Sequence, residues 1–287
     1  DGHRPIDRSR TRLHLTCPGR TGRDCSGPCC RGSRDDPFSQ HGNRAAACRD
    51  PHTLHPGRAG APRAGKAITY VCNQNINVTN LCVNACGFCG FSKKPGDEGI
   101  YFHDKTEIQK KAAMARERQV TEICTVSGLH PDFSAQSYSD VYRWIHEAAP
   151  GVHLHASNPM EVAYAAKRSR LSTVEVLEMM KEAGLGSMCG TAAEILVDSV
   201  RDKICRQKIP TKEWVRIITE AHGLGIRTTA TIMYGHCETD RDRVKHLGIL
   251  RDIQDETSGF TEFVPLSFIH MNTPLFKAGK ARAGATG

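Results

Sequence analysis

The sequence lacks several features that would place it in other classes of protein. It has no apolar run of the roughly 18–20 residues that a membrane-spanning helix needs, and no apolar core of a secretory signal peptide. No Gly-x-Gly-x-x-Gly motif follows an expected strand, which argues against a dinucleotide-binding fold. We therefore expect a cytoplasmic protein with no membrane partner.

Acidic residues are scarce in only one part of the chain. Of the 287 residues, 39 are Lys or Arg and 31 are Asp or Glu, which gives a net charge of +8. Residues 1–66 hold 13 of the basic and 6 of the acidic side chains, so the remainder is nearly neutral. A nucleic-acid-binding function would have to rest on that first segment, which has no Tyr or Trp to stack on bases. We expect no nucleic-acid partner.

Residues 1–66 also lack Val, Met and Glu, and they are rich in Pro, Gly and Arg. A segment with so little to bury should stay disordered, so we expect disorder there and a folded domain over residues 67–287. The Arg content would suit a targeting presequence, but the acidic residues and the lack of an amphipathic period argue against one. An incorrect gene start is a further interpretation. We assign no metal site to the five cysteines of this segment.

The chain has 13 cysteines, an odd and unevenly spaced set that does not resemble a disulfide framework. Three of them, Cys82, Cys86 and Cys89, have the spacing Cys-x3-Cys-x2-Cys and follow an alternating, strand-like run at residues 75–78. This spacing directs three thiolates at one small volume, which suits a soft metal or an iron–sulfur cluster.

A fourth cysteine is missing from this local set. A structural zinc site usually has four ligands, and an ordinary 4Fe-4S ferredoxin cluster is also held by four cysteines. A cubane held by three would leave one iron free to bind a substrate or cofactor. Two alternatives stay open: a zinc site completed by Cys72 or His103, or three unrelated buried thiols.

Apolar, β-branched runs alternate with helical patterns after residue 66. Strands are predicted at residues 68–71, 122–126, 152–156, 227–233 and 261–266, with a weaker candidate at 185–189. Helices are predicted at residues 106–119, 138–149, 172–183, 211–223 and 240–255. Ser172 with Glu175 forms a capping box, and Thr211 is the expected cap of its helix. This order implies parallel βα units, in an open doubly wound sheet or a β/α barrel.

Several polar residues follow the predicted strands. They are His130, His155, Tyr234, His236 and His270. Each alone is more often a packed residue than a catalyst, but in a barrel they would share the carboxyl ends of the strands. Histidine acts as acid, base or hydrogen-bond donor near neutral pH, so these five are the candidate catalytic residues.

The run Cys82-x3-Cys86-x-Phe88-Cys89 resembles the signature loop of the radical S-adenosylmethionine (SAM) enzymes. In that family the open iron of a 4Fe-4S cluster chelates the amino and carboxylate groups of SAM. An electron from the reduced cluster then cleaves SAM to methionine and a 5′-deoxyadenosyl radical. The resemblance implies a full or partial β/α (TIM-type) barrel, a 4Fe-4S cluster on the three cysteines, and an electron donor as partner.

The same resemblance implies where SAM would be bound. Phe88 occupies the aromatic position before the last cysteine of the signature loop. Ser127 and Gly128 follow the second strand, where a glycine lets backbone amides approach the methionine part of SAM. Glu194 follows the fourth strand. We expect these four residues to contact the cofactor.

Three further stretches, at residues 190–196, 229–236 and 259–271, resemble the 4-hydroxyphenyl transferase subunit of deazaflavin synthase. That family joins the 4-hydroxybenzyl part of L-tyrosine to 5-amino-6-(D-ribitylamino)uracil, towards coenzyme F-420, and a second radical SAM subunit or fused domain completes the ring. Compared with that family, the barrel is expected to be incomplete at its C-terminus. Two alternatives are a radical SAM enzyme of futalosine-dependent menaquinone synthesis and a non-catalytic iron–sulfur or zinc-binding module.

Overall fold

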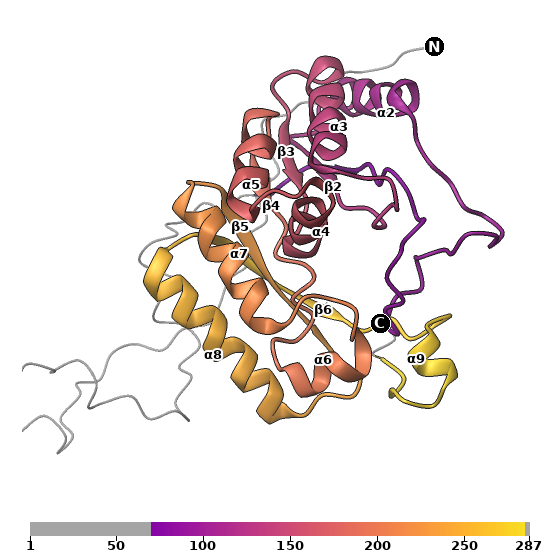
Figure 1. Cartoon of the computed structure of the whole chain (residues 1–287), viewed down its shortest axis with the longest axis vertical. Coiled ribbons are helices and arrows are strands. Elements are labelled where there is room, and N and C mark those ends of the chain that lie inside the picture. The colour runs from indigo at the N-terminus through magenta and orange to yellow at the C-terminus, as the bar shows by residue number, and fades with distance from the viewer. Residues whose placement is uncertain (1–69, 285–287) are drawn as a thin grey trace, which may run out of the picture. The chain divides into compact units, whose positions relative to one another are not determined.

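Strands and helices alternate along the part of the chain that the computed structural model describes, residues 70–284 (Figure 1). The strands are β1 (Asn73–Asn75), β2 (Glu122–Thr125), β3 (His153–Ala156), β4 (Ser187–Met188), β5 (Arg227–Tyr234) and β6 (Phe260–Ser267). The helices are α2 (Lys105–Glu117), α3 (Ala135–Ala148), α4 (Pro159–Ser169), α5 (Thr173–Glu182), α6 (Asp198–Ile204), α7 (Thr211–Gly223), α8 (Asp240–Thr257) and α9 (Pro274–Lys277). None of these helices is long and apolar enough to cross a membrane.

The six strands form one parallel sheet in which the spatial order equals the chain order, β1 to β6. A doubly wound sheet would reverse its strand order at a switch point. A β/α barrel adds each strand beside the one before it, as here. The prediction of a parallel sheet of the β/α barrel type is therefore confirmed over the described residues.

The helices form one layer over the sheet, in which α3 packs against α5, α5 against α7, and α7 against α8 (Figure 1). Successive strand residues point to opposite faces, so Ile123 and Leu154 project towards the helices and are fully buried. Trp214 on α7 belongs to the same apolar core. The opposite face of the sheet is more polar and carries His155 and Ser187. The side of the sheet that faces the helices is therefore apolar. The polar side chains lie on the opposite, concave side.

Local signals set most helix starts. The capping box of Ser172 and Glu175 is confirmed at the start of α5. The predicted cap at Thr211 is wrong, because Pro210 is the N-cap residue of α7 and makes no side-chain cap bond. Thr211 instead donates through its N–H and hydroxyl to Asp198 Oδ1, at 2.9 and 2.7 Å, so it ties α7 to α6.

Two other differences concern element positions. Strand β1 begins at Asn73, later than the predicted strand at residues 68–71, of which only residues 70 and 71 are described. Helix α4 was not predicted, although Asn158 caps it and Pro159 occupies its first turn, a typical helix start. The expected disorder of residues 1–66 lies outside the described residues.

Candidate active site

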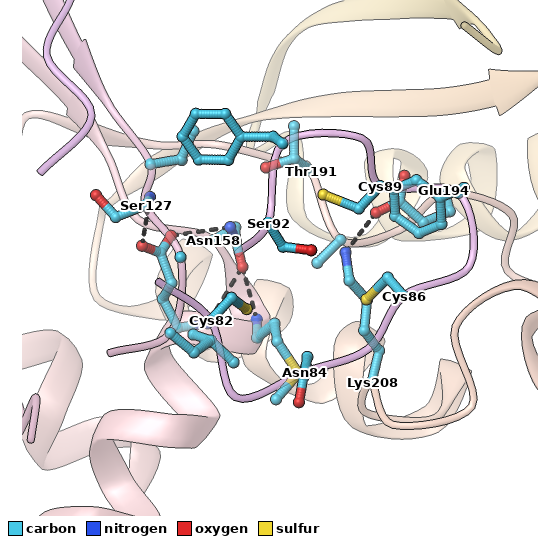
Figure 2. A pocket seen from close by; sticks show the side chains of 18 of the residues that line it. Cys82, Asn84, Cys86, Cys89, Ser92, Ser127, Asn158, Thr191, Glu194 and Lys208 are labelled. Carbon is cyan, nitrogen blue, oxygen red and sulfur yellow. Dashed lines mark hydrogen bonds and ion pairs between the residues drawn. The ribbon is translucent and has the colours of Figure 1, made fainter. Parts of the chain in front are cut away.

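Loops that follow the first four strands enclose a cavity at the carboxyl ends of the sheet (Figure 2). The cysteine loop, residues 82–89, supplies Cys82, Cys86 and Cys89 to its wall. Side chains from the segments after β2, β3 and β4 complete the wall, and Ser127, Asn158, Thr191 and Glu194 are among them. The structure therefore brings the predicted metal ligands and the predicted cofactor contacts into one site.

The cysteine loop is held from outside by polar side chains. Lys94 Nζ donates to the carbonyl oxygens of Cys82 and Asn84, at 2.7 and 2.6 Å. The N–H of Ala85 donates to Gln207 Oε1 at 2.5 Å. Because these bonds hold the backbone from behind, the thiol side chains are left to face the cavity.

Cys86 is the most buried of the three cysteines, with 8% of its surface exposed. Burial raises the pKa of its thiol to about 12, and the nearby Lys208 ammonium opposes that shift. A thiolate at this position needs positive charge beside it, which a bound metal supplies directly. The burial of Cys86 therefore suits a metal ligand better than a free nucleophile.

Neither residue proposed to complete a zinc site lines the cavity. Cys72 lies before the amino end of β1, where its N–H donates to Thr121 Oγ1 at 3.0 Å. The ring of His103 packs on Tyr101, with 4.8 Å between ring centroids. Among residues 70–284, no three His, Cys, Asp or Glu side chains are placed to hold a single metal ion. The described geometry therefore does not support a zinc site completed by Cys72 or His103.

Three buried polar atoms of the cavity wall have no hydrogen-bond partner among the described residues: Asn77 Oδ1, Asn84 Nδ2 and Thr191 Oγ1. Buried polar groups in native proteins are almost always paired. A ligand with both donors and acceptors would pair them, and SAM offers amino, carboxylate, hydroxyl and adenine groups. The donor set of this cavity therefore fits SAM as well as an iron–sulfur cluster.

A buried carboxyl group connects two of the loops. Glu161 Oε1 accepts from the N–H of Ser127 at 3.1 Å, and Glu161 Oε2 accepts from Asn158 Nδ2 at 2.8 Å. The hydroxyl of Ser127 in turn accepts from the N–H of Val78, at 2.8 Å. Burial raises the pKa of Glu161 to about 8, against the opposing effect of these hydrogen bonds. The network fixes the loop after β2 relative to the loop after β3.

Gly128 is required by close packing of backbone on backbone. A Cβ atom at this position would lie 2.4 Å from the carbonyl oxygen of Leu81, next to Cys82. The N–H of Gly128 donates to the Thr79 carbonyl at 2.9 Å. The glycine thus lets the loop after β2 lie directly against the start of the cysteine loop. Its expected contact with SAM stays a prediction.

Glu194 is paired with a lysine that the sequence pattern did not reveal. Lys208 Nζ lies 2.5 Å from Glu194 Oε1 and 5.0 Å from the centre of the Phe88 ring (Figure 2). Burial would lower the pKa of Lys208, but Glu194 and Cys86 raise it above its ordinary value, so the ammonium stays charged. A fixed positive charge therefore lies beside the cysteine loop.

Arg201 joins the segment after β4 to the segment that carries Lys208. Only 3% of its surface is exposed. Its guanidinium donates to the carbonyl oxygens of Ala192 and Ala193, and to that of Ile209 at 2.5 Å. Ala192 and Glu194 have positive φ angles of 65° and 47°, a strained conformation for residues with a side chain. Arg201 helps to hold this strained turn, and with it Glu194.

The five candidate catalytic residues do not line the cavity. His130 packs between the rings of Phe102 and Phe133. His155 lies on β3, where its Nδ1 is 2.7 Å from Ser187 Oγ, and burial lowers its pKa. His130 follows β2 and His155 lies on β3, so both belong to the first half of the sheet. Neither residue lines the cysteine cavity.

The other three candidates lie at the end of β5 or after it. Tyr234 packs under the Arg243 guanidinium, 5.8 Å from the ring centre. His236 is fully buried, and its Nδ1 lies 3.2 Å from Glu238 Oε2. His270 packs edge-to-face against Phe276. Their catalytic roles stay predictions, because a substrate would have to reach them outside the cysteine cavity.

Several residues of the cavity wall were not predicted from the sequence, chiefly Lys208, Glu161 and Asn158. Met160 also lines the cavity, and its sulfur accepts from the N–H of Ile209 at 3.4 Å. The sequence did hold a signal for two of them, because Asn-Pro-x-Glu at residues 158–161 is a typical helix start after a strand. Lys208 lies in a loop with no recognisable pattern.

The match to known families defines the class of protein. Residues 76–250 match the model of the radical SAM superfamily, and the chain belongs to that family. Its members use a 4Fe-4S cluster and SAM, which agrees with the three cysteines and the unpaired polar atoms of the cavity.

Curated relatives are more specific. The chain is 77% identical over 224 residues to a protein of Methanosphaerula palustris named 5-amino-6-(D-ribitylamino)uracil–L-tyrosine 4-hydroxyphenyl transferase, covering 78% of this chain and 61% of the relative. A protein of Methanocaldococcus jannaschii with the same name is 50% identical over 226 residues, covering 78% of this chain and 63% of the relative. The chain thus spans about three fifths of the length of these relatives.

Solved structures support the fold alone, because sequence identity is low. One crystal structure of HydG, a maturase of the [FeFe]-hydrogenase, gives a TM-score of 0.54 at 16% identity, over 68% of this chain and 42% of that chain. The crystal structure of methylornithine synthase (PylB) gives 0.51 at 14% identity, over 71% and 55% of the two chains.

Proposed function

We propose that the protein is a radical SAM transferase that joins the 4-hydroxybenzyl group of L-tyrosine to 5-amino-6-(D-ribitylamino)uracil, in deazaflavin (coenzyme F-420) biosynthesis. The observation that carries the proposal is 77% identity to a relative with this transferase name over a segment that includes every cavity residue. The shared name favours this activity over the futalosine-pathway alternative. A cytoplasmic location and a second radical SAM subunit or fused domain as partner belong to the same proposal.

In the proposed reaction, Cys82, Cys86 and Cys89 hold the cluster, which when bound supplies the electron that cleaves SAM to a 5′-deoxyadenosyl radical. The chain contributes orientation and exclusion of water around a reactive species. The unpaired amide of Asn84 and the hydroxyl of Thr191 are available to SAM.

The hydrogen-bonded loops that border the cavity keep it in one shape. Glu161 connects the segments after β2 and β3. The Glu194–Lys208 pair and Arg201 fix the segment after β4. We propose that Ser127, Gly128, Phe88 and Glu194 contact SAM.

The substrates are proposed to bind outside the cysteine cavity, near the five candidate catalytic residues. His130, His155, Tyr234, His236 and His270 offer hydrogen-bonding groups that suit a phenol and a ribityl-uracil. A site that binds the phenol hydroxyl should reject phenylalanine strongly, because its buried polar partners would be left unpaired.

The test is anaerobic reconstitution followed by incubation with reductant, SAM, tyrosine and the uracil. Mass spectrometry should find 5′-deoxyadenosine together with a uracil adduct that carries the 4-hydroxybenzyl group. Iron and sulfide analysis of the same sample should give a 4Fe-4S content, and stoichiometric zinc without sulfide would contradict the cofactor assignment. Deoxyadenosine that forms equally well without tyrosine, and with no adduct, would reject the substrate assignment only.

A further inference from the structure

A second groove lies on the outer side of the cysteine loop, between that loop, α4 and the segment before α7. Val83, Asn84, Lys167, Arg168 and Gln207 are among its eleven lining residues, and we call it the outer groove. Three of its lining residues, Asn84, Met160 and Lys208, also line the cysteine cavity, so their side chains separate the groove from the cavity. A molecule in the outer groove would therefore lie one layer of side chains from the cavity.

The outer groove carries uncompensated positive charge. None of its lining residues is acidic. Lys167 and Arg168 are exposed, and neither forms an ion pair within residues 70–284. The charge of Lys208 is matched by Glu194. The groove therefore attracts an acidic surface or an anionic molecule.

The groove also has an apolar part, at the place where it meets the cysteine loop. Val83 is 45% exposed, and Pro131, Ala163 and Ile209 lie around it. An apolar centre with a charged rim is typical of a protein–protein interface. Val83 and Asn84 are joined through the backbone to Cys82 and Cys86, two of the three cluster ligands. Few covalent bonds therefore separate this surface from the cluster, and electron transfer between proteins is faster over shorter paths.

We propose that the outer groove is the docking surface for an acidic one-electron carrier protein of the flavin or iron–sulfur type. The inference rests on the proposed function, because reductive cleavage of SAM needs one electron from outside the protein. With a flavin carrier, the hydroquinone is oxidised to the semiquinone as one electron passes to the cluster, and no bond forms between the proteins. Lys167 and Arg168 bring the acidic carrier to Val83, and Gln207 holds the cysteine loop through Ala85.

The test compares the reconstituted full chain with the double variant Lys167→Glu/Arg168→Glu. Reduced flavodoxin is the probe, and three quantities are measured: its dissociation constant, the rate of flavin oxidation by stopped-flow absorbance, and deoxyadenosine formation driven by dithionite. The matched control is Lys110→Glu/Arg116→Glu, which reverses two charges on α2 that form no ion pair within the described residues. The milder Lys167→Gln/Arg168→Gln repeats the comparison if charge reversal disturbs folding.

The proposal requires flavodoxin to bind at least about tenfold more weakly to the variant, with a similar fall in the rate of flavin oxidation. Wild-type binding should weaken as ionic strength rises from about 0.05 to about 0.2 M, because exposed charges are screened. Dithionite-driven deoxyadenosine formation should not change, and the control should match wild type in all three measurements.

Equal flavodoxin affinity in wild type and both groove variants would overturn the proposal. So would tight binding of inorganic phosphate that depends on Lys167 and Arg168, in a protein that does not bind flavodoxin, because the groove would then be a small-anion site. Failure of the proposed function has a different signature: no deoxyadenosine forms even with dithionite, whatever the binding of flavodoxin.

Discussion

Two buried glutamates, one near each half of the sheet, differ in their hydrogen-bond partners and in the direction of their pKa shifts. Glu161 lies beside the cysteine cavity, and burial raises its pKa to about 8. Glu238 follows β5. Burial opposes its ionisation, but hydrogen bonds from the N–H of Gly235 and from Arg243, and the nearby His236, lower its pKa to about 2. The first carboxyl group has few partners, and the second has many.

The same contrast holds for the surroundings of each glutamate. The wall of the cysteine cavity contains unpaired buried atoms on Asn77, Asn84 and Thr191. Around Glu238, Arg243 donates from Nε and Nη2, at 2.9 and 2.5 Å, and the N–H of His236 donates at 2.9 Å. Unpaired polar atoms in a cavity indicate a ligand. The carboxyl group of Glu238 is fully paired, although His236 Nδ1 beside it and His246 Nε2 also lack a hydrogen-bond partner among the described residues. The difference between the two glutamates supports the proposed placement of the cofactors at the β1–β4 end.

The largest effect is expected for the cysteine ligands. Cys86→Ala should abolish SAM cleavage, because a cluster with two thiolates cannot be held in place. Cys72→Ala should retain wild-type cleavage, since Cys72 lies before the amino end of β1. Deoxyadenosine yield and iron content after reconstitution measure both variants. Equal losses in the two would contradict the assignment of the cluster to the cysteine loop.

Gly128→Ala should have the second-largest effect on SAM cleavage. The added methyl group would lie 2.4 Å from the Leu81 carbonyl oxygen, so the loop after β2 must move away from the cysteine loop. We expect the KM for SAM to rise about a hundredfold, because a small misplacement of a site can cost that much. Gly248→Ala is the control, because no heavy atom lies within 4 Å of the position its Cβ would occupy.

Glu238→Gln should lower stability more than activity. The change removes the buried partner of Arg243, but the Arg243 side chain is 35% exposed and keeps its ion pair with Asp240, so we expect a cost of about 1 kcal/mol rather than that of a fully buried pair. The folded pKa lies below the ordinary value of 4.5, so the stabilisation is present above pH 4.5 and is lost as pH falls towards 2. Urea unfolding of the two proteins should therefore give free energies that converge in acid. A constant difference would show that the carboxylate charge is not involved.

Glu161→Gln should show the opposite pH dependence. The folded pKa is raised, so the folded state binds a proton that the unfolded chain releases, and wild-type stability should fall as pH rises from 4.5 to 8. The variant should lack this fall, because glutamine does not titrate, and near pH 5 the two proteins should differ by no more than about 1 kcal/mol. Parallel unfolding curves across this pH range would mean that Glu161 is ionised throughout.

The smallest effect on SAM cleavage is expected for His155→Gln. His155 lies outside the cysteine cavity, on the concave side of the sheet next to Ser187. Cleavage of SAM by dithionite should stay within about twofold of wild type, while formation of the uracil adduct should fall, if this residue contacts substrate as proposed. A variant with unchanged adduct formation would remove His155 from the candidate catalytic residues.

Sequence alone predicted the parts of the site that lie close together in the chain. The cysteine spacing, the alternation of strands and helices, and the capping box at Ser172 are all local patterns. Glu161, Lys208 and Arg201 escaped prediction because their partners, such as Ser127 and Glu194, come from other loops that only the folded sheet brings near. The five candidate catalytic residues lie in or after the expected strands, and their catalytic roles stay predictions. Their side chains, however, contact neighbours such as Phe133, Ser187 and Glu238.

The in-order sheet also has a consequence for how the chain is made. Each strand pairs with the strand that the ribosome has just released, so a new βα unit always finds its partner already present. Contacts between sequential units keep the sequence separation of partners modest, which favours fast folding. Proteins of this size generally fold in stages during synthesis. The cysteine loop and the loops that pack on it belong to the first units, so the pocket for the cluster can assemble before the later strands emerge.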